Sequence, residues 1–353
     1  MKNSSKKARK RWARRQLVIS LCALLVMLLS LLYIFHYEHT RREILRRNAE
    51  FSALYEAPTL APTAMPTPAP TAGPSPAPTE IPTSVPTTAP SSLPEDTPSP
   101  APALEATPTP TPAPTQAFEI AADATRVPLA TPDADTLVVA MQTPPPVQES
   151  FGALLDANPE TVAFLNIEGV LSLPVVQRPN DNDFYLSHSL DQEEALEGTL
   201  FLDGANLLVP EDDCLIVYGH NMRNGTMFRP LINYEDVDFL KENAMVRFDT
   251  LYENRGYVPF AALTVTADPG SDRYINLRQF SYDQPGFDLF VRSLRTLSIW
   301  ESPVEVAYGD SVLLLVTCEY THNNGRFVLA LRAVREGESW EQLEEQVQMS
   351  ELK

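Results

Sequence analysis

Cysteine and histidine are scarce throughout this sequence, and basic side chains are scarce in its carboxyl-terminal part. Three cysteines and five histidines occur among 353 residues, without a CxxC step, paired histidines or an Asp-rich loop. Zinc and calcium sites require such patterns, so we expect no metal and no other cofactor. From residue 147 onward, 34 acidic side chains stand against 14 basic ones. Nucleic-acid binding needs a basic face, so we expect no nucleic-acid partner and interpret the acidic surface as a source of solubility.

The amino-terminal part combines a basic segment with an apolar one. Eight Lys and Arg side chains lie within residues 1–16, and an uncharged run rich in Leu and Val extends from Leu17 to Phe35. This run is long enough to cross a bilayer, which predicts a transmembrane helix over 17–36 and a charged juxtamembrane segment over 37–56. The heavier basic flank predicts a cytoplasmic segment 1–16 and places everything after the single span outside the plasma membrane.

A cleaved signal peptide is the alternative interpretation of this run. Cleavage requires small residues after the apolar core, and bulky ones stand there instead: Tyr33, Phe35, His36 and Tyr37. The length of the run and these residues favour an anchor that stays attached.

Proline is concentrated in one segment. Of the 33 prolines, 24 lie between Pro58 and Pro146, mostly in PT, AP and TP steps. Such a segment cannot bury enough apolar surface to fold, so we predict a disordered Pro/Thr/Ala-rich linker over 57–147. At about 3 Å per residue, its full extension reaches on the order of 250 Å. It either carries a tethered domain from the membrane into a thick wall or has no role beyond its length.

The rest of the chain predicts a mainly β domain over 148–337 and a tail over 338–353. Helical spacing occurs at 149–157, 234–243 and 286–300; we expect a short turn at 159–164 and a solvated helix at 341–349. Many short strands with one long late helix favour a closed β-barrel with helices outside. The strands are predicted by short apolar runs at 171–177, 199–203, 214–220, 244–250, 257–265, 311–318 and 326–334.

Reactive side chains stand at the ends of three of these strands. His220 follows one apolar run in the stretch YGHNM, Cys318 closes another in the stretch TCEY, and Arg326 opens the last. A histidine can protonate a leaving amine, a cysteine can attack a carbonyl, and an arginine can hold the oxyanion or the peptide backbone. This is the inventory of a cysteine transpeptidase.

The ordered pattern resembles the sortases, and most closely the class B sortases. Further segments match in the same order, over about residues 149–336: LPVVQ at 173–177, DNDFYLSH at 181–188, GTLFLD at 198–203 and MFRPLINY at 227–234. The resemblance implies a closed barrel of about eight strands with flanking helices, a long helix before the cysteine strand, and a catalytic domain facing the cell wall of a Gram-positive bacterium.

Rival residues exist for two of the three roles. The resemblance assigns the acid role to His220, although His322 is closer to the cysteine in sequence; His188 is expected to be structural. Cys214 lies inside an apolar run and is interpreted as a small buried hydrophobe, which leaves Cys318 as the nucleophile. Three neighbours are possible auxiliary residues: Thr317, Glu319 and Asn221. Glu319 either orients the histidine or the arginine, or is simply a solvated side chain.

The reaction that the resemblance implies is transpeptidation. Cys318 attacks a threonine carbonyl in the carboxyl-terminal sorting motif of a secreted protein, and an amine of a peptidoglycan precursor or a pilin lysine accepts the acyl group. A weak or inactive sortase-like binding module on a stalk is one alternative, and a cysteine peptidase hydrolysing the same motif is another. The sorting motif stays open, because residues 162–164 and 315–318 depart from the usual class B pattern.

Overall fold

The computed structural model describes residues 2–56, 144–319 and 325–353. The predicted linker therefore lies outside the described residues except for its last four positions, 144–147. Its predicted disorder stays a prediction.

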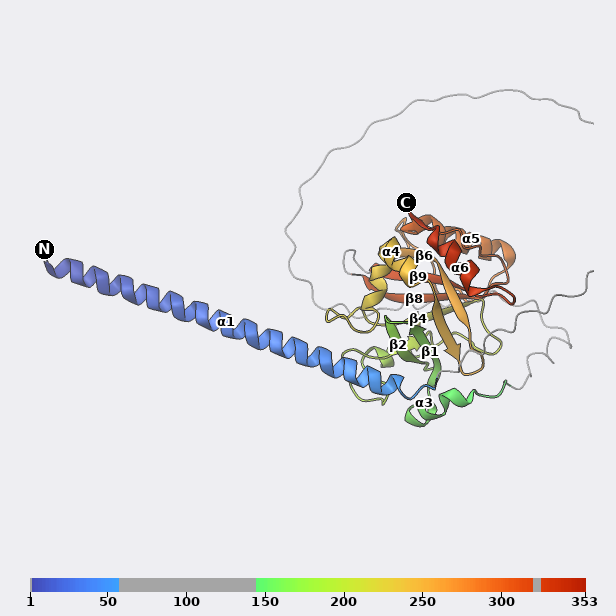
Figure 1. The fold of residues 1–353 in the computed structure, drawn as a ribbon, viewed down its shortest axis with the longest axis horizontal. Helices are drawn as coiled ribbons and strands as arrows, with labels where there is room; N and C mark the ends of the chain where they lie inside the picture. The colour runs from blue at the N-terminus through green and yellow to red at the C-terminus, as the bar shows by residue number, and fades with distance from the viewer. Residues whose placement is uncertain (1, 57–143, 320–324) are drawn as a thin grey trace, which may run out of the picture. The chain divides into compact units, whose positions relative to one another are not determined.

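Eight strands close into a barrel in the order β1-β2-β3-β4-β8-β9-β6-β5 (Figure 1). This confirms the mainly β prediction. A separate pair is formed by β7 (Trp300–Glu301) and β10 (Glu351–Leu352). The barrel strands are β1 (Thr161–Ile167), β2 (Leu171–Val176), β3 (Leu200–Leu202), β4 (Cys214–Tyr218), β5 (Val246–Thr250), β6 (Gly256–Thr266), β8 (Val312–Glu319) and β9 (Gly325–Ala333).

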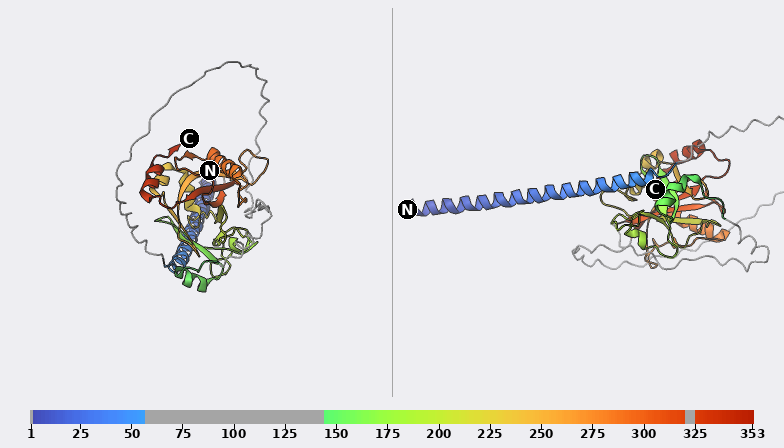
Figure 2. Two further views of the ribbon diagram at one scale, coloured as in Figure 1. Left: turned by 90° about the vertical axis from the view of Figure 1, so that its right-hand side faces the viewer. Right: turned by 90° about the horizontal axis from the view of Figure 1, so that it is seen from below.

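Helices surround the barrel and precede it (Figures 1 and 2). The long helix expected before the cysteine strand is α5 (Gln284–Leu297), which buries an apolar face and is capped by the Asp283 side chain at its start. The other helical elements are α1 (Lys2–Ser52), η1 (Glu149–Phe151), α3 (Gly152–Ala157), η2 (Phe184–Leu186), η3 (Arg229–Glu235), α4 (Val237–Glu242) and α6 (Trp340–Gln348).

The strands that carry the predicted site are neighbours in the barrel. All five residues of β4 are buried, and β4 pairs in parallel with β8, which in turn pairs antiparallel with β9. Because both faces of these strands are covered, their sequences are continuous apolar runs rather than alternating ones. Such rigid, fully paired strands fix the backbone positions at which the reactive residues stand.

Two expectations from the sequence are wrong. The turn predicted at 159–164 is confined to residues 159–160, and the rest of that range is the start of β1, which pairs with both β2 and β5. Its short apolar run does not distinguish strand from helix, and pairing on both sides decides the outcome. The terminal helix α6 is present but is not fully solvated, because Leu343 and Val347 are buried in the core.

The helix α1 includes the predicted span. Its part Ile19–Ser52 contains an 18-residue window of mean hydropathy 2.4, none of which is buried. By length and composition this helix can cross a membrane.

Candidate active site

Cys318 stands near the end of β8, where β9 runs along one side and the chain that continues from β4 lies on the other. On one side, the antiparallel pairing with β9 places Cys318 directly opposite Arg326. Residues directly opposite each other in an antiparallel pair are separated by about 4.5–5.5 Å between their Cα atoms. The register of the sheet thus brings together the cysteine and the arginine that the sequence suggested.

His220 reaches the same level of the sheet from the other side. The parallel ladder pairs Tyr218 with Val316, and the Gly219 amide donates to the Val316 carbonyl at 3.2 Å. Two further residues along each chain lead to His220 and Cys318. His220, Cys318 and Arg326 are separated by up to about a hundred positions in sequence. They therefore lie on three adjacent segments of the chain at one end of the barrel.

A hydrogen bond to the main chain orients the His220 ring. Its Nε2 atom lies 2.7 Å from the carbonyl oxygen of Leu186, the last residue of η2. A carbonyl can only accept, so Nε2 must carry the hydrogen in this contact. The loop after His220 is closed by a bond from the Phe228 amide to the His220 carbonyl at 2.9 Å, and Asn221 is buried within it.

A polar cluster holds η2, and with it the Leu186 carbonyl. Arg178 makes a forked ion pair with Glu160 at 2.8 and 2.9 Å, and its guanidinium lies 3.5 Å from the centre of the Phe184 ring. The Tyr185 hydroxyl donates to Glu160 as well. Burial and then the Glu160 carboxylate raise the pKa of Tyr185 to about 12, so this donor stays protonated.

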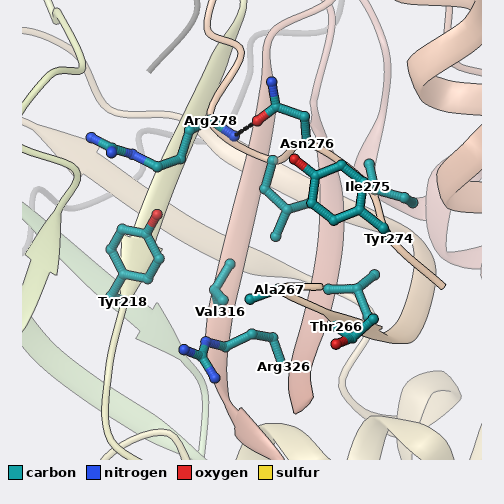
Figure 3. Close-up of a pocket in the computed structure, with 11 residues that line it drawn as sticks. Tyr218, Thr266, Ala267, Tyr274, Ile275, Asn276, Arg278, Val316 and Arg326 are labelled. Atoms are coloured by element: carbon teal, nitrogen blue, oxygen red, sulfur yellow. Dashed lines mark hydrogen bonds between the residues drawn. The ribbon is translucent and has the colours of Figure 1, made fainter. Parts of the chain in front are cut away.

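A pocket opens beside the paired strands at this end of the barrel (Figure 3). Val316 and Arg326 line it from β8 and β9, and Tyr218 lines it from β4. The opposite wall comes from the segment that follows β6, including Tyr274 and Ile275. Alternate residues of a strand face one side, so position 318 belongs to the same face of β8 as Val316. The pocket therefore lies on the face of β8 to which position 318 belongs.

A buried charge pair lies beside this pocket, and Arg278 is its member that lines the pocket. Arg278 forks onto Asp203 with bonds of 2.8 and 2.9 Å, and Asp203 has no exposed surface. The Tyr218 hydroxyl donates to the same carboxylate at 3.1 Å. Burial, together with the charge of Asp203, holds the pKa of Tyr218 well above its ordinary value. The aromatic wall of the pocket is thus fixed by a satisfied buried ion pair.

Asp203 and Arg278 were missed at the sequence level. Asp203 ends the apolar run GTLFLD, and an acid at the end of a buried strand is a usable signal. Arg278 lies between β6 and α5 and has no pattern that points to the site. Only the fold brings it to the carboxylate.

The auxiliary and rival residues fall in several places. Thr317 is fully buried, and within the described residues its hydroxyl has no hydrogen-bond partner. Strand alternation puts it on the face opposite to positions 316 and 318, so it serves the interior of the barrel. Glu319 pairs with Gly325 at the end of β8, and His322 lies outside the described residues.

The second cysteine and the third histidine are structural in their surroundings. Cys214 is completely buried, and burial, followed by Asp212 and Asp213, raises the pKa of its thiol far above the usual range. It cannot supply a thiolate. His188 stacks on Phe184 with a centroid separation of 3.8 Å and bonds to the Phe184 carbonyl. Among the described residues, no group of three or more His, Cys, Asp or Glu is arranged to hold a metal ion.

This fold and these strand ends define a class of protein, the sortase-type cysteine transpeptidases. No protein-family model matches the chain. It is 30% identical over 186 residues to sortase B of Listeria monocytogenes, covering 52% of this chain and 73% of that relative. Sortase B of Staphylococcus aureus is 28% identical over 192 residues, covering 54% and 76%. The chain belongs to the sortase B family.

Solved structures similar to the chain carry related names. A Bacillus anthracis protein described as similar to sortase B is 27% identical, with 54% of this chain and 84% of that chain covered and a TM-score of 0.48. A complex of Staphylococcus aureus sortase B with substrate is 25% identical, with 54% and 88% covered and a TM-score of 0.47.

Proposed function

We propose that this sortase is anchored in the membrane and uses Cys318 as nucleophile, His220 as proton donor and Arg326 as the oxyanion-binding cation. The cysteine sulfur adds to the threonine carbonyl of a sorting peptide. The carbon–nitrogen bond then breaks, and the departing amine takes a proton from His220. A second amine attacks the resulting thioester and gives a proton back to His220, so that a new amide forms and the thiolate is released.

The observation that carries this proposal is the position of Cys318 between the segments that carry Arg326 and His220. It stands opposite Arg326 on β9, and the ladder between β4 and β8 leads to the level of His220. A cation on one side and an imidazole on the other favour the thiolate over the thiol. The guanidinium also carries donors in a planar fork, which suits a carbonyl oxygen that gains negative charge.

The pocket beside these residues suits a peptide with a small number of apolar side chains. Its walls combine the aromatic rings of Tyr218 and Tyr274 with the aliphatic Val316 and Ile275, and two guanidinium groups lie at its edges (Figure 3). An extended peptide can place side chains against the rings and its main-chain oxygens near Arg326. The substrate is thus expected to be the carboxyl-terminal sorting signal of a secreted protein.

The acceptor and the location complete the proposal. The amine comes from a peptidoglycan precursor or from a pilin lysine, and the barrel lies outside the cell, facing the wall. The apolar helix α1 and the basic side chains before it support a single span with a cytoplasmic amino terminus.

The test is a product analysis. The purified protein is incubated with a panel of sorting peptides and an amine, and the products are identified by mass. Transpeptidation predicts the amino-terminal peptide fragment joined through threonine to the amine. Hydrolysed peptide alone, in the presence of amine, would identify a cysteine peptidase, and the absence of any product across the panel would identify a binding module.

A further inference from the structure

The end of α1 that follows the apolar run is packed against the barrel. We call residues 37–52 the juxtamembrane helix. Ile44 on this helix is only 4% exposed, although neighbouring Leu45 is 44% exposed. An isolated helix cannot bury one aliphatic side chain to this degree, so Ile44 marks the face of the helix that contacts the domain. Contacts with β2 are the main ones between α1 and a strand.

Polar contacts continue along the same face. Arg47 pairs with Glu197 at 3.3 Å, and the Ser52 hydroxyl donates to the Ser172 carbonyl at 2.7 Å. The adjacent Arg46 bonds instead to Glu43 and Glu50 of its own helix, with all three side chains exposed. The difference between Arg46 and Arg47 shows which side of the helix faces the barrel.

Tyr55, just beyond the helix, is part of the barrel core. Its ring stacks on Phe164 with a centroid separation of 4.1 Å and meets Phe151 edge to face. Its hydroxyl donates to Asp249 of β5 at 2.8 Å. A stacked, hydrogen-bonded and 9% exposed tyrosine is a firm anchor for the chain that precedes it.

The other end of the juxtamembrane helix contacts the loop that follows His220. The Tyr37 hydroxyl donates to the Arg223 carbonyl at 2.9 Å, and Arg41 Nε donates to the Asn224 carbonyl at 2.9 Å. Tyr37 comes two residues after Phe35, the last residue of the apolar run, which is about 3 Å of helix rise. If the apolar run lies in a bilayer, loop 221–227 must lie at the level of its head groups.

Both ends of the Pro-rich segment are fastened to the same strand end. Tyr55 bonds to Asp249, while the Gln148 amide donates to the Leu251 carbonyl at 2.8 Å and its side chain donates to the Thr250 carbonyl at 2.7 Å. The segment between them begins and ends on the barrel. Its length therefore cannot determine how far the barrel lies from the apolar part of α1.

We propose that the juxtamembrane helix holds the barrel directly on its own membrane anchor, with loop 221–227 against the lipid head groups. This rests on the membrane anchoring in the proposed function. The enzyme then acts at the outer surface of the bilayer, on peptides and amines that are themselves held there, and the Pro-rich segment is not the spacer that its composition suggests. Arg223, exposed in this loop, is placed to contact lipid phosphates.

The test measures the distance of the loop from the bilayer in the full chain. Arg223→Cys, in a background of Cys22→Ser and Cys318→Ala, carries a fluorophore; Cys214 is buried and does not react. The protein is placed in phosphatidylcholine vesicles that contain an acceptor-labelled lipid, and energy transfer is recorded. We expect strong transfer that is unchanged when residues 60–140 are deleted.

Matched variants separate docking from anchoring. Ile44→Asp puts a charge into the contact face and should lower transfer, because the barrel is then tied to the anchor helix only through Tyr55 and loop 221–227 can move away from the head groups. Leu45→Asp leaves its charge in water and should retain transfer. The milder pair Arg47→Ala and Arg46→Ala should show reduced and unchanged transfer, respectively.

The outcomes are decisive in each arm. Transfer that rises when residues 60–140 are deleted from the parent, or that is unchanged in Ile44→Asp, would overturn the proposal. Failure of the full chain to float with vesicles would overturn the anchoring, and this proposal with it, but would leave the product analysis of the transpeptidase chemistry intact.

Discussion

The main-chain carbonyl of Leu186 accepts a hydrogen bond from Nε2 of His220 at 2.7 Å. The catalytic role proposed for His220 thus depends on a short helix, η2, that lies on a different segment of the chain. Because the acceptor is a backbone atom, its position is set by whatever packs around η2 rather than by a side chain that could be exchanged.

Gly198 offers a way to move this carbonyl. A Cβ atom at position 198 would lie 2.3 Å from the Tyr185 carbonyl oxygen and 3.0 Å from that of Leu186. Gly198→Ala should displace η2 and with it the Leu186 carbonyl that orients His220. A shift of about 1 Å in a catalytic group can cost on the order of a hundredfold in turnover. We expect kcat to fall more than KM rises, with a shifted pH profile, in a peptide cleavage assay.

Gly169→Ala is the matched control for this variant. Gly169 also has a positive φ, of 71° against 59° for Gly198, but no atom lies within 4 Å of its Cβ position. It therefore reproduces the backbone strain without the collision. Equal losses in both variants would mean that strain alone, and not the Leu186 carbonyl, is responsible.

Cys318→Ala should abolish formation of the acyl-enzyme, while Cys214→Ala should retain it. The reason is that Cys214 is buried with a raised thiol pKa, whereas Cys318 pairs with Arg326, which lines the pocket. The measurement is intact-protein mass after reaction with a sorting peptide or a thiol-reactive probe. Labelling that persists in Cys318→Ala and disappears in Cys214→Ala would reverse the assignment.

Arg326→Lys distinguishes a directional role of the guanidinium from a purely electrostatic one. Lysine keeps the charge but loses the planar fork of donors. Loss of one oxyanion donor costs on the order of a hundredfold to a thousandfold, so Arg326→Lys and Arg326→Ala should both lose turnover on this scale. Turnover of the two variants and the parent is compared on one peptide, with circular dichroism as the control for folding.

Near-parental activity in Arg326→Lys would refute oxyanion binding in favour of charge alone. Near-parental activity in Arg326→Ala would remove this residue from the site altogether.

Acid should destabilise the domain through Glu160. Burial by itself raises the pKa of this carboxyl, but hydrogen bonds from Arg178 and Tyr185 outweigh burial and bring the pKa below its ordinary value of 4.5. A lowered pKa means that the stabilisation is present above the ordinary value and disappears as the pH falls through the folded-state pKa. Glu160→Gln should therefore lower the melting temperature at neutral pH and make it less sensitive to acid.

Thermal melts of Glu160→Gln and the parent between about pH 7 and pH 3 provide the measurement. The exposed Glu168, changed to Gln, serves as the control and should leave the melting curve unaltered. If Glu160→Gln keeps the full acid sensitivity of the parent, the ion pair with Arg178 is not its source.

Much of the fold could be predicted because the informative strands are buried on both faces. The runs that became β4, β8 and β9 are continuous and apolar, and each has a residue type with recognisable chemistry at one end. The run that became β1 was misjudged, since a short apolar segment after a proline is compatible with either a turn or a strand. Pairing with β2 and β5 determines its state, and pairing is not a local property.

By itself, the sequence determined the apolar run at 17–35, the proline-rich segment, a barrel of short strands and the three reactive residue types. All of these follow from composition and local periodicity. The tertiary structure alone decided which partners these residues meet: register sets Arg326 opposite Cys318, η2 supplies the carbonyl for His220, and Arg278 reaches Asp203. It also placed the juxtamembrane helix on the barrel, because contacts between distant segments depend on how the whole chain closes and not on the residues nearest in sequence.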